Sequence, residues 1–185
     1  MEASHTDGHV TAPSLVVVSG PAGSGKTTLA HELARAIGCP AICRDEIKEG
    51  MAHATGRFEA TPGDALTMRT MPLFFSVVRL LLEAGVTVVA EAAFEDKVWR
   101  PNLERLAELA RLRIVQCHAD PATARRRVSD RVTSRSAHAD AEVIGDDQYF
   151  DNFHRVAFSA PSIDVNTVSG YEPAIERIVD FVNQG

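Results

Sequence analysis

One stretch near the N-terminus constrains the fold of this chain more than any other. Leu15–Ser19 (LVVVS) is a continuous apolar, β-branched run, which is typical of a strand buried on both faces. Gly20–Thr27 follows directly and matches the pattern GxxxxGK[ST] in full. Thr27–Ile37 then has the apolar periodicity of a helix, which Gly38 ends. A strand, a glycine-rich turn and a helix in this order predict a phosphate-binding loop in an α/β fold.

The residue types in this loop indicate its chemistry. Glycines allow successive backbone N–H groups to point inward at phosphate oxygens, and the following helix adds its positive end. Lys26 would bring a charge to the β- and γ-phosphates, and the Thr27 hydroxyl would ligate Mg²⁺. The sequence therefore predicts a site for ATP or GTP with Mg²⁺. Its members are Gly20, Ala22, Gly23, Ser24, Gly25, Lys26, Thr27 and Thr28.

Strand and helix signals alternate along the rest of the chain. The expected strands are Leu15–Ser19, Ala41–Arg44, Val86–Ala90, Arg113–Cys117 and Ile163–Thr167. The expected helices are Thr27–Ile37, Glu46–Ala54, Asp64–Ala84 with a kink at Pro72, 97–111, Pro121–Arg135, 146–158 and Pro173–Asn183. Helical crossovers force neighbouring strands to pair in parallel, so we expect one sheet with helices on both faces.

The composition of the chain indicates in which compartment the protein works and which classes of partner it can bind. Residues 1–14 read as a flexible tail and residues 15–185 as one domain. The sparse cysteines Cys39, Cys43 and Cys117 are expected to be reduced thiols of a cytoplasmic protein. A formal net charge of −6 argues against long nucleic acid as a partner. We expect no membrane partner, because no apolar run in the sequence approaches the roughly 18–20 residues that span a bilayer.

Three segments together resemble the P-loop small-molecule kinases and phosphotransferases. They are the loop at 20–27, the segment Arg44–Lys48 (RDEIK) and the RxxxRxxxRxxH run at 127–138. Similar families include the chloramphenicol phosphotransferase-like, zeta-toxin-like and bacterial AAA-type kinases. The resemblance implies a three-layer P-loop NTPase fold, whose five-stranded parallel sheet has the order 2-3-1-4-5. It also implies an arginine-bearing lid at about residues 121–145.

Two acidic residues at the carboxyl ends of strands are candidates for the site: Asp45 joins Lys26 as a catalytic candidate, and Glu91 is a candidate for the metal or the substrate. In similar enzymes an aspartate at the position of Asp45 accepts the proton of the acceptor hydroxyl; its alternative role is to cap the next helix. Glu91 follows the third strand, where most P-loop proteins have an aspartate that supports Mg²⁺ through water. A glutamate could instead contact the substrate, or pair structurally with Lys97 or Arg100.

Arginines gather in the region that the resemblance assigns to the lid. Arg127, Arg131 and Arg135 are spaced i, i+4 and i+8, so they share one stripe of a helix. Arg127 and Arg131 are the candidates for stabilising charge during phosphoryl transfer, and Arg131 and Arg135 for binding the nucleotide. A solvated charged face is the alternative. We assign no role to His138 and Asp140, which follow this run.

Apolar residues near the second and third strands suggest an acceptor pocket. Its candidate members are Arg44, Asp45, Phe58, Met71, Glu91, Phe94 and Trp99. Few cations lie near these positions, which favours a neutral hydroxyl acceptor such as a sugar, an antibiotic or a nucleoside. Two alternatives remain open: a kinase that acts on a polynucleotide end or a nucleotide sugar, and a regulatory nucleotide-binding module without catalysis. The sequence does not distinguish ATP from GTP, and it does not give the oligomeric state.

Overall fold

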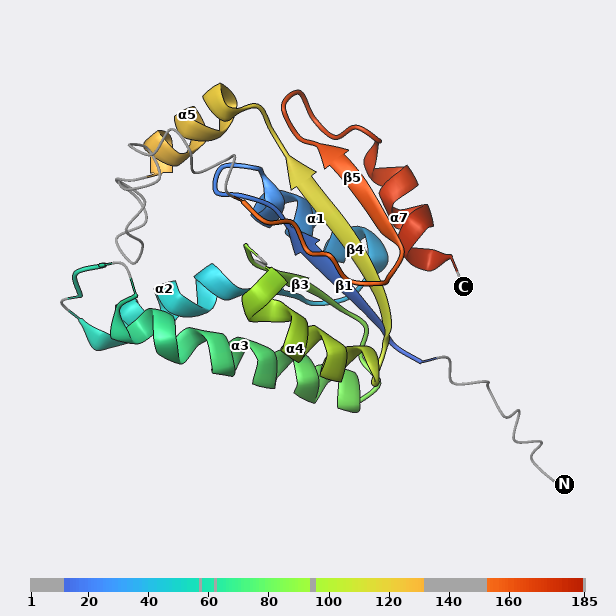
Figure 1. Ribbon diagram of the computed structural model, residues 1–185, viewed down its shortest axis with the longest axis horizontal. Coiled ribbons are helices and arrows are strands. Elements are labelled where there is room, and N and C mark those ends of the chain that lie inside the picture. The colour runs from blue at the N-terminus through green and yellow to red at the C-terminus, as the bar shows by residue number, and fades with distance from the viewer. Residues whose placement is uncertain (1–11, 57, 62, 94–95, 132–152, 185) are drawn as a thin grey trace, which may run out of the picture.

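The computed structural model describes residues 12–56, 58–61, 63–93, 96–131 and 153–184, and Figure 1 shows their arrangement. Five strands form a parallel sheet in the order β2-β3-β1-β4-β5, which confirms the expected fold class and strand order. The strands are β1 (Ser14–Ser19), β2 (Ala41–Cys43), β3 (Val88–Glu91), β4 (Arg111–His118) and β5 (Ser162–Asn166). The helices are α1 (Lys26–Ile37), α2 (Arg44–Thr55), α3 (Ala65–Glu83), α4 (Asp96–Ala107), α5 (Pro121–Arg131) and α7 (Ile175–Asn183).

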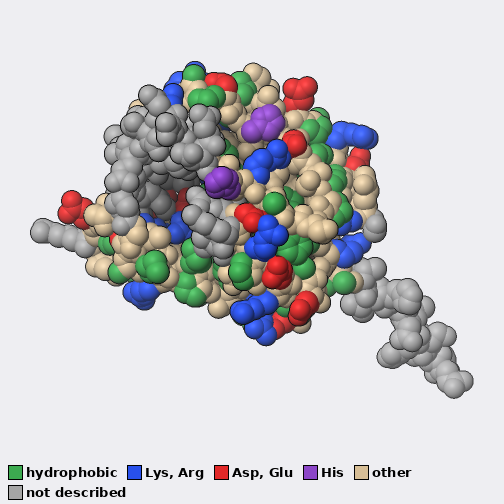
Figure 2. Space-filling model, in the orientation of Figure 1, with side chains coloured by type: hydrophobic (Ala, Val, Ile, Leu, Met, Phe, Trp, Pro, Cys, Tyr) green, Lys and Arg blue, Asp and Glu red, His purple; other side chains and the backbone are tan. Residues whose placement is uncertain are grey.

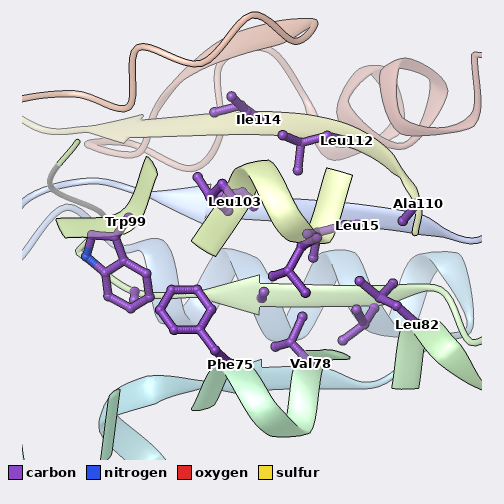
Figure 3. Packing of buried hydrophobic residues seen from close by; sticks show 14 of the residues in the cluster. Leu15, Phe75, Val78, Leu82, Trp99, Leu103, Ala110, Leu112 and Ile114 are labelled. Carbon is purple, nitrogen blue, oxygen red and sulfur yellow. The ribbon is translucent and has the colours of Figure 1, made fainter. Parts of the chain in front are cut away.

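The central strand β1 is buried on both faces and divides the core into two layers. Leu15 and Val17 point to one layer, which α3 and α4 cover and whose packing Figure 3 shows. Val16 and Val18 point to the opposite layer, which α1 and α7 cover. This alternation follows from the two-residue period of a strand. The apolar run at 15–18 therefore supplies both layers of the core.

Helix α3 is the longest described helix, and it continues through Pro72. Asp64 caps its start by accepting a hydrogen bond from the Thr67 backbone N–H at 2.8 Å. Contrary to our sequence-based expectation, this helix is long and apolar enough to cross a membrane, by length and composition only. A core helix meets the same criterion, and one face of α3 is buried against the sheet through Phe74 and Val78.

Some element boundaries differ from those expected. The helix predicted at 97–111 ends at Ala107, because β4 begins at Arg111 in register with Ser14 of β1. Residues 153–158 are not helical, contrary to the prediction for 146–158. There Val156 is buried, and its carbonyl accepts a hydrogen bond from the Gln116 side chain at 3.2 Å. The other residues of that predicted helix lie outside the described ranges.

Candidate active site

The glycine-rich loop passes close to two neighbouring segments. Gly23 has a φ of 74°, and a Cβ built there would lie 2.3 Å from the backbone oxygen of Ala124 in α5. Gly25 has a φ of 77°, and its Cβ would lie 3.0 Å from the Thr167 hydroxyl. Both positions therefore require glycine for the backbone conformation and for space. Gly20 and Ala22 lie in the same loop, and Thr28 lies in the first turn of α1.

A cluster of charged and polar groups lies where this loop meets the end of β3. The Thr27 hydroxyl donates a hydrogen bond to Glu91 Oε2 at 3.2 Å. Lys26 Nζ lies 3.8 Å from Glu91 Oε1 and 3.4 Å from the Pro21 carbonyl. The alternative that Glu91 pairs with Arg100 is wrong, because Arg100 pairs with Asp96. The side chain of Lys97 lies outside what the structure describes.

The surroundings of Glu91 fit a role near a magnesium ion. The side chain is fully buried, and its Oε1 atom accepts no hydrogen bond within the described part of the chain. Burial raises the pKa of this carboxyl, the Lys26 ammonium lowers it, and the net shift is upward. A buried carboxylate with an unused oxygen beside a hydroxyl is a donor set that suits Mg²⁺, which keeps several of its own waters. The residues present therefore fit the ion that the loop implies.

Asp45 lies close to Glu91 because it follows β2, the strand that pairs with β3. Cys43, the last residue of β2, pairs in register with Glu91, and Asp45 follows two residues later. It lies in the first turn of α2 with Cys43 at the N-cap, so the alternative of Asp45 as the capping residue is wrong. Arg44 Nη1 donates a hydrogen bond to Asp45 Oδ1 at 2.9 Å. Both candidates thus stand at the carboxyl edge of the sheet, where ligands bind in open α/β folds.

Arg127 contacts the phosphate-binding loop itself. Its guanidinium donates hydrogen bonds to the Gly23 carbonyl at 3.2 Å and to the Thr167 hydroxyl and carbonyl at 3.0 and 2.6 Å. The Thr167 hydroxyl in turn donates to the Ser24 carbonyl at 2.7 Å. Arg131 donates to the Arg127 carbonyl at 3.1 Å. In this arrangement Arg127 holds α5, the loop and the segment after β5 together.

A cavity of about 640 Å³ lies beside this network. Its described lining combines glycine backbone, two arginines and several acceptors: Gly23, Gly25, Thr28, Glu32, Arg127, Asp130, Arg131, Thr167, Gly170 and Tyr171. Its volume is in the range of small-molecule and cofactor sites. Because Gly23 and Gly25 of the phosphate-binding loop form part of its lining, this cavity is the candidate site for the base and ribose of a nucleotide.

The structure brings together only some of the residues predicted to form an acceptor pocket. Phe58 and Met71 are partly buried, and the Lys48 ammonium lies 5.7 Å from the centre of the Phe58 ring. Trp99 is only 3% exposed and packs edge-on against Phe74, so it has almost no surface for a substrate. A tryptophan in the core and a tryptophan that lines a pocket cannot be distinguished from the sequence alone. The remaining predicted residues lie outside the described ranges: Phe94, Arg135, His138 and Asp140.

Two features escaped the sequence-based prediction. Thr167 was expected only as the end of a strand, and nothing local indicates that it would contact the loop more than a hundred residues earlier. Lys48 and Asp64 form a buried ion pair at 2.8 Å that joins α2 to the start of α3. Only the capping position of Asp64 could be read from the sequence.

This fold and site define a P-loop nucleotide-binding domain. A family model described as an AAA domain matches residues 15–153, and the chain belongs to that family. No curated protein matches it. The resemblance to P-loop small-molecule kinases is confirmed at the level of the fold, by the family model and by the solved structures described next.

Several solved structures share the fold. A provisionally assigned kinase from Chloroflexus aurantiacus has 20% identity and a TM-score of 0.80, with 94% of this chain and 98% of that chain covered. An unliganded sugar kinase from Janibacter has 20% identity and a TM-score of 0.65, with 94% and 95% covered. The APS kinase of Mycobacterium tuberculosis, in complex with AMPPNP and APS, has 15% identity and a TM-score of 0.65, with 94% and 98% covered. At these identities the similarity establishes the fold.

Proposed function

We propose that this protein transfers the γ-phosphate of ATP or GTP to a hydroxyl of a small molecule, with Mg²⁺ as cofactor. The observation that carries the proposal is the placement of two acidic residues beside the phosphate-binding loop. Glu91 contacts Thr27 and lies near Lys26, and Asp45 follows the neighbouring strand. A module that only bound nucleotide would need the loop and the magnesium site, but it would not need a second carboxylate at the acceptor side.

Each group then has a role in the transfer. The loop amides and Lys26 would bind the β- and γ-phosphates, while Thr27 and, through water, Glu91 would hold Mg²⁺, which neutralises phosphate charge. Asp45 would orient the acceptor hydroxyl in line with the γ-phosphorus and accept its proton. Arg44 holds one oxygen of Asp45 and would thereby fix the direction of its carboxylate. Arg131 lines the nucleotide cavity and would contact the bound nucleotide there.

Charge and composition favour a small, neutral acceptor. On the face that Figure 2 shows, the coloured Lys and Arg side chains are interspersed with Asp and Glu, and they form no continuous basic surface. A polynucleotide substrate would call for such a surface. Similar solved structures include a sugar kinase, a gluconokinase and an APS kinase, whose named substrates are small molecules. We therefore place sugars, nucleosides and hydroxyl-bearing antibiotics first.

An acceptor screen tests the proposal. The purified protein is incubated with γ-labelled ATP or GTP, Mg²⁺ and panels of sugars, nucleosides, antibiotics and a 5′-hydroxyl oligonucleotide. We expect label on one small-molecule class, and no transfer by Lys26→Ala. Growth of expressing bacteria on the antibiotic panel is a parallel measurement. Label on the oligonucleotide alone would favour a polynucleotide kinase. Tight nucleotide binding with no transfer to any acceptor would favour a regulatory module.

A further inference from the structure

Three side chains with metal-ligand atoms lie together on the edge of the sheet beside α1. They are His31 in α1, Cys43 at the end of β2 and Glu46 in the first turn of α2, and their ligand atoms all lie within 4.8 Å of one another. His31 Nε2 is 2.7 Å from Glu46 Oε1 and 3.7 Å from Cys43 Sγ. None of the three was assigned a role in nucleotide binding above.

One residue of the cluster is buried, and the other two are partly exposed to solvent. Cys43 is 2% exposed, whereas the side chains of His31 and Glu46 are 43% and 42% exposed. The thiol is therefore the buried member of the cluster, and the imidazole and the carboxylate are its solvent-exposed members. An ion would approach from the side of His31 and Glu46, which face solvent.

We propose that His31, Cys43 and Glu46 form a binding site for a zinc ion, with water as the fourth ligand. Sulfur, imidazole and carboxylate together are a donor set that Zn²⁺ accepts and that the hard ion Mg²⁺ does not favour. In a tetrahedral zinc site, sulfur and nitrogen ligands lie about 3.5 Å apart, as follows from their bond lengths. The Sγ–Nε2 distance of 3.7 Å is close to this value. The Nε2–Oε1 distance of 2.7 Å must lengthen, which two solvent-exposed side chains allow.

The charges around the thiol also suit a cation. The carboxylates of Glu91 and Glu46 both lie close enough to the Cys43 thiol to interact with it. On binding, the S–H bond breaks, its proton passes to solvent, and sulfur bonds the metal as a thiolate; His31 binds through the lone pair of a neutral Nε2. The site would join α1 to the start of α2, and zinc would stabilise the folded protein.

Cobalt spectroscopy tests the site, because a thiolate-to-cobalt charge-transfer band requires a cysteine ligand. We expect Co²⁺ to give this band with one equivalent bound, and Zn²⁺ to displace it. Cys43→Ser should abolish the band, and His31→Ala should weaken binding at least about tenfold. The matched controls Cys39→Ser and His53→Ala should retain the wild-type titration. Thr27→Ala should also retain it, since it alters only the magnesium site.

The outcomes separate this site from the nucleotide site. Absence of the band in the wild-type protein would overturn the proposal, as would a band that persists in Cys43→Ser. If Cys43→Ser does not fold, His31→Ala decides, because its side chain is half-exposed. Unchanged cobalt affinity in that variant would also contradict the site. Loss of the band in Thr27→Ala would contradict a metal site that is independent of the phosphate-binding loop.

Discussion

At the scale of single residues, Glu91 has the environment that most clearly departs from that of an ordinary acidic side chain. It is fully buried, one oxygen accepts from Thr27, and the other faces Lys26 at 3.8 Å. A buried carboxylate is costly unless charges or hydrogen bonds compensate it. Here the compensating groups are Thr27 and Lys26, the two loop residues that we propose bind metal and phosphate. Glu91 therefore couples the end of β3 to the nucleotide site.

Glu91→Gln tests this coupling. The amide keeps the size of the side chain and can still accept from Thr27, but it removes the charge that attracts Mg²⁺. We expect the apparent affinity for Mg²⁺ in nucleotide binding to fall about 10–100-fold, as for other outer ligands of a metal. This affinity is measured by titrating Mg²⁺ into the protein with a fluorescent nucleotide. Glu176→Gln, at an exposed position of α7, is the control. An unchanged Mg²⁺ requirement would remove Glu91 from the metal site.

At the scale of elements, the phosphate-binding loop depends on segments distant in sequence. Helix α5 contributes Arg127, and the segment after β5 contributes Thr167, which donates to the Ser24 carbonyl. The loop itself could be predicted because its motif is local and the spacing of its residues determines the conformation. The contacts of Thr167 could not, since they arise from tertiary packing. The prediction that Trp99 lines an acceptor pocket missed its place in the core for the same reason, because that place depends on packing against α3.

Thr167→Val tests the support of the loop by its neighbours. Valine has nearly the same shape but cannot donate to Ser24 or accept from Arg127, which leaves buried groups without partners. Such a loss costs about 1–3 kcal/mol. We expect nucleotide affinity to fall roughly tenfold, measured by calorimetry, with the fold retained. Thr55→Val removes an exposed hydroxyl from α2 and should leave affinity unchanged. Equal affinities in both variants would show that the loop does not need Thr167.

The ion pair between Lys48 and Asp64 should stabilise the junction of α2 and α3. Burial raises the pKa of Asp64, but hydrogen bonds from Lys48 and the Thr67 N–H outweigh it, so the net pKa is lowered. This stability is present above the unfolded pKa of about 4 and is lost as pH falls through the lower folded value. Asp64→Ala should lower the free energy of unfolding by about 3 kcal/mol, measured by urea unfolding at neutral pH.

An exposed pair on α3 provides the control for this measurement. Arg79 and Glu83 also form an ion pair, with side chains 67% and 43% exposed. Glu83→Ala should change the free energy of unfolding by no more than about 0.5 kcal/mol. If Asp64→Ala lowered the free energy of unfolding as little as Glu83→Ala, the buried pair would not hold the two helices together.

At the scale of the whole molecule, the sheet and its two helical layers place the phosphate-binding loop, Asp45 and Glu91 at one edge. The order β2-β3-β1-β4-β5 puts the ends of β2 and β3 beside the loop after β1. Five strands in alternation with helices could be predicted from periodicity, and the resemblance supplied their order. The buried residues of β1 could also be predicted, because a continuous apolar run is specific for a central strand. The relative positions of the candidate acceptor residues could not be predicted, since these residues come from separate elements.

Nucleotide binding should stabilise the whole domain. Mg·ADP at about 100 times its dissociation constant contributes about 2.7 kcal/mol to the folded state. For a chain of this size that raises Tm by roughly 5–10 °C. Thermal unfolding with and without Mg·ADP measures the shift, and Lys26→Ala should largely abolish it. A shift of the same size in that variant would mean that the nucleotide binds elsewhere.

The most direct test of the account is transfer of the γ-phosphate by Asp45→Asn, with the acceptor found in the screen. The central claim is that the carboxylate beside the phosphate-binding loop makes a nucleotide binder into a phosphotransferase. We predict that single-turnover transfer falls at least about 100-fold while nucleotide affinity stays within about twofold of wild type. Asp180→Asn, on the exposed face of α7, should transfer normally. Undiminished transfer by Asp45→Asn would contradict the claim.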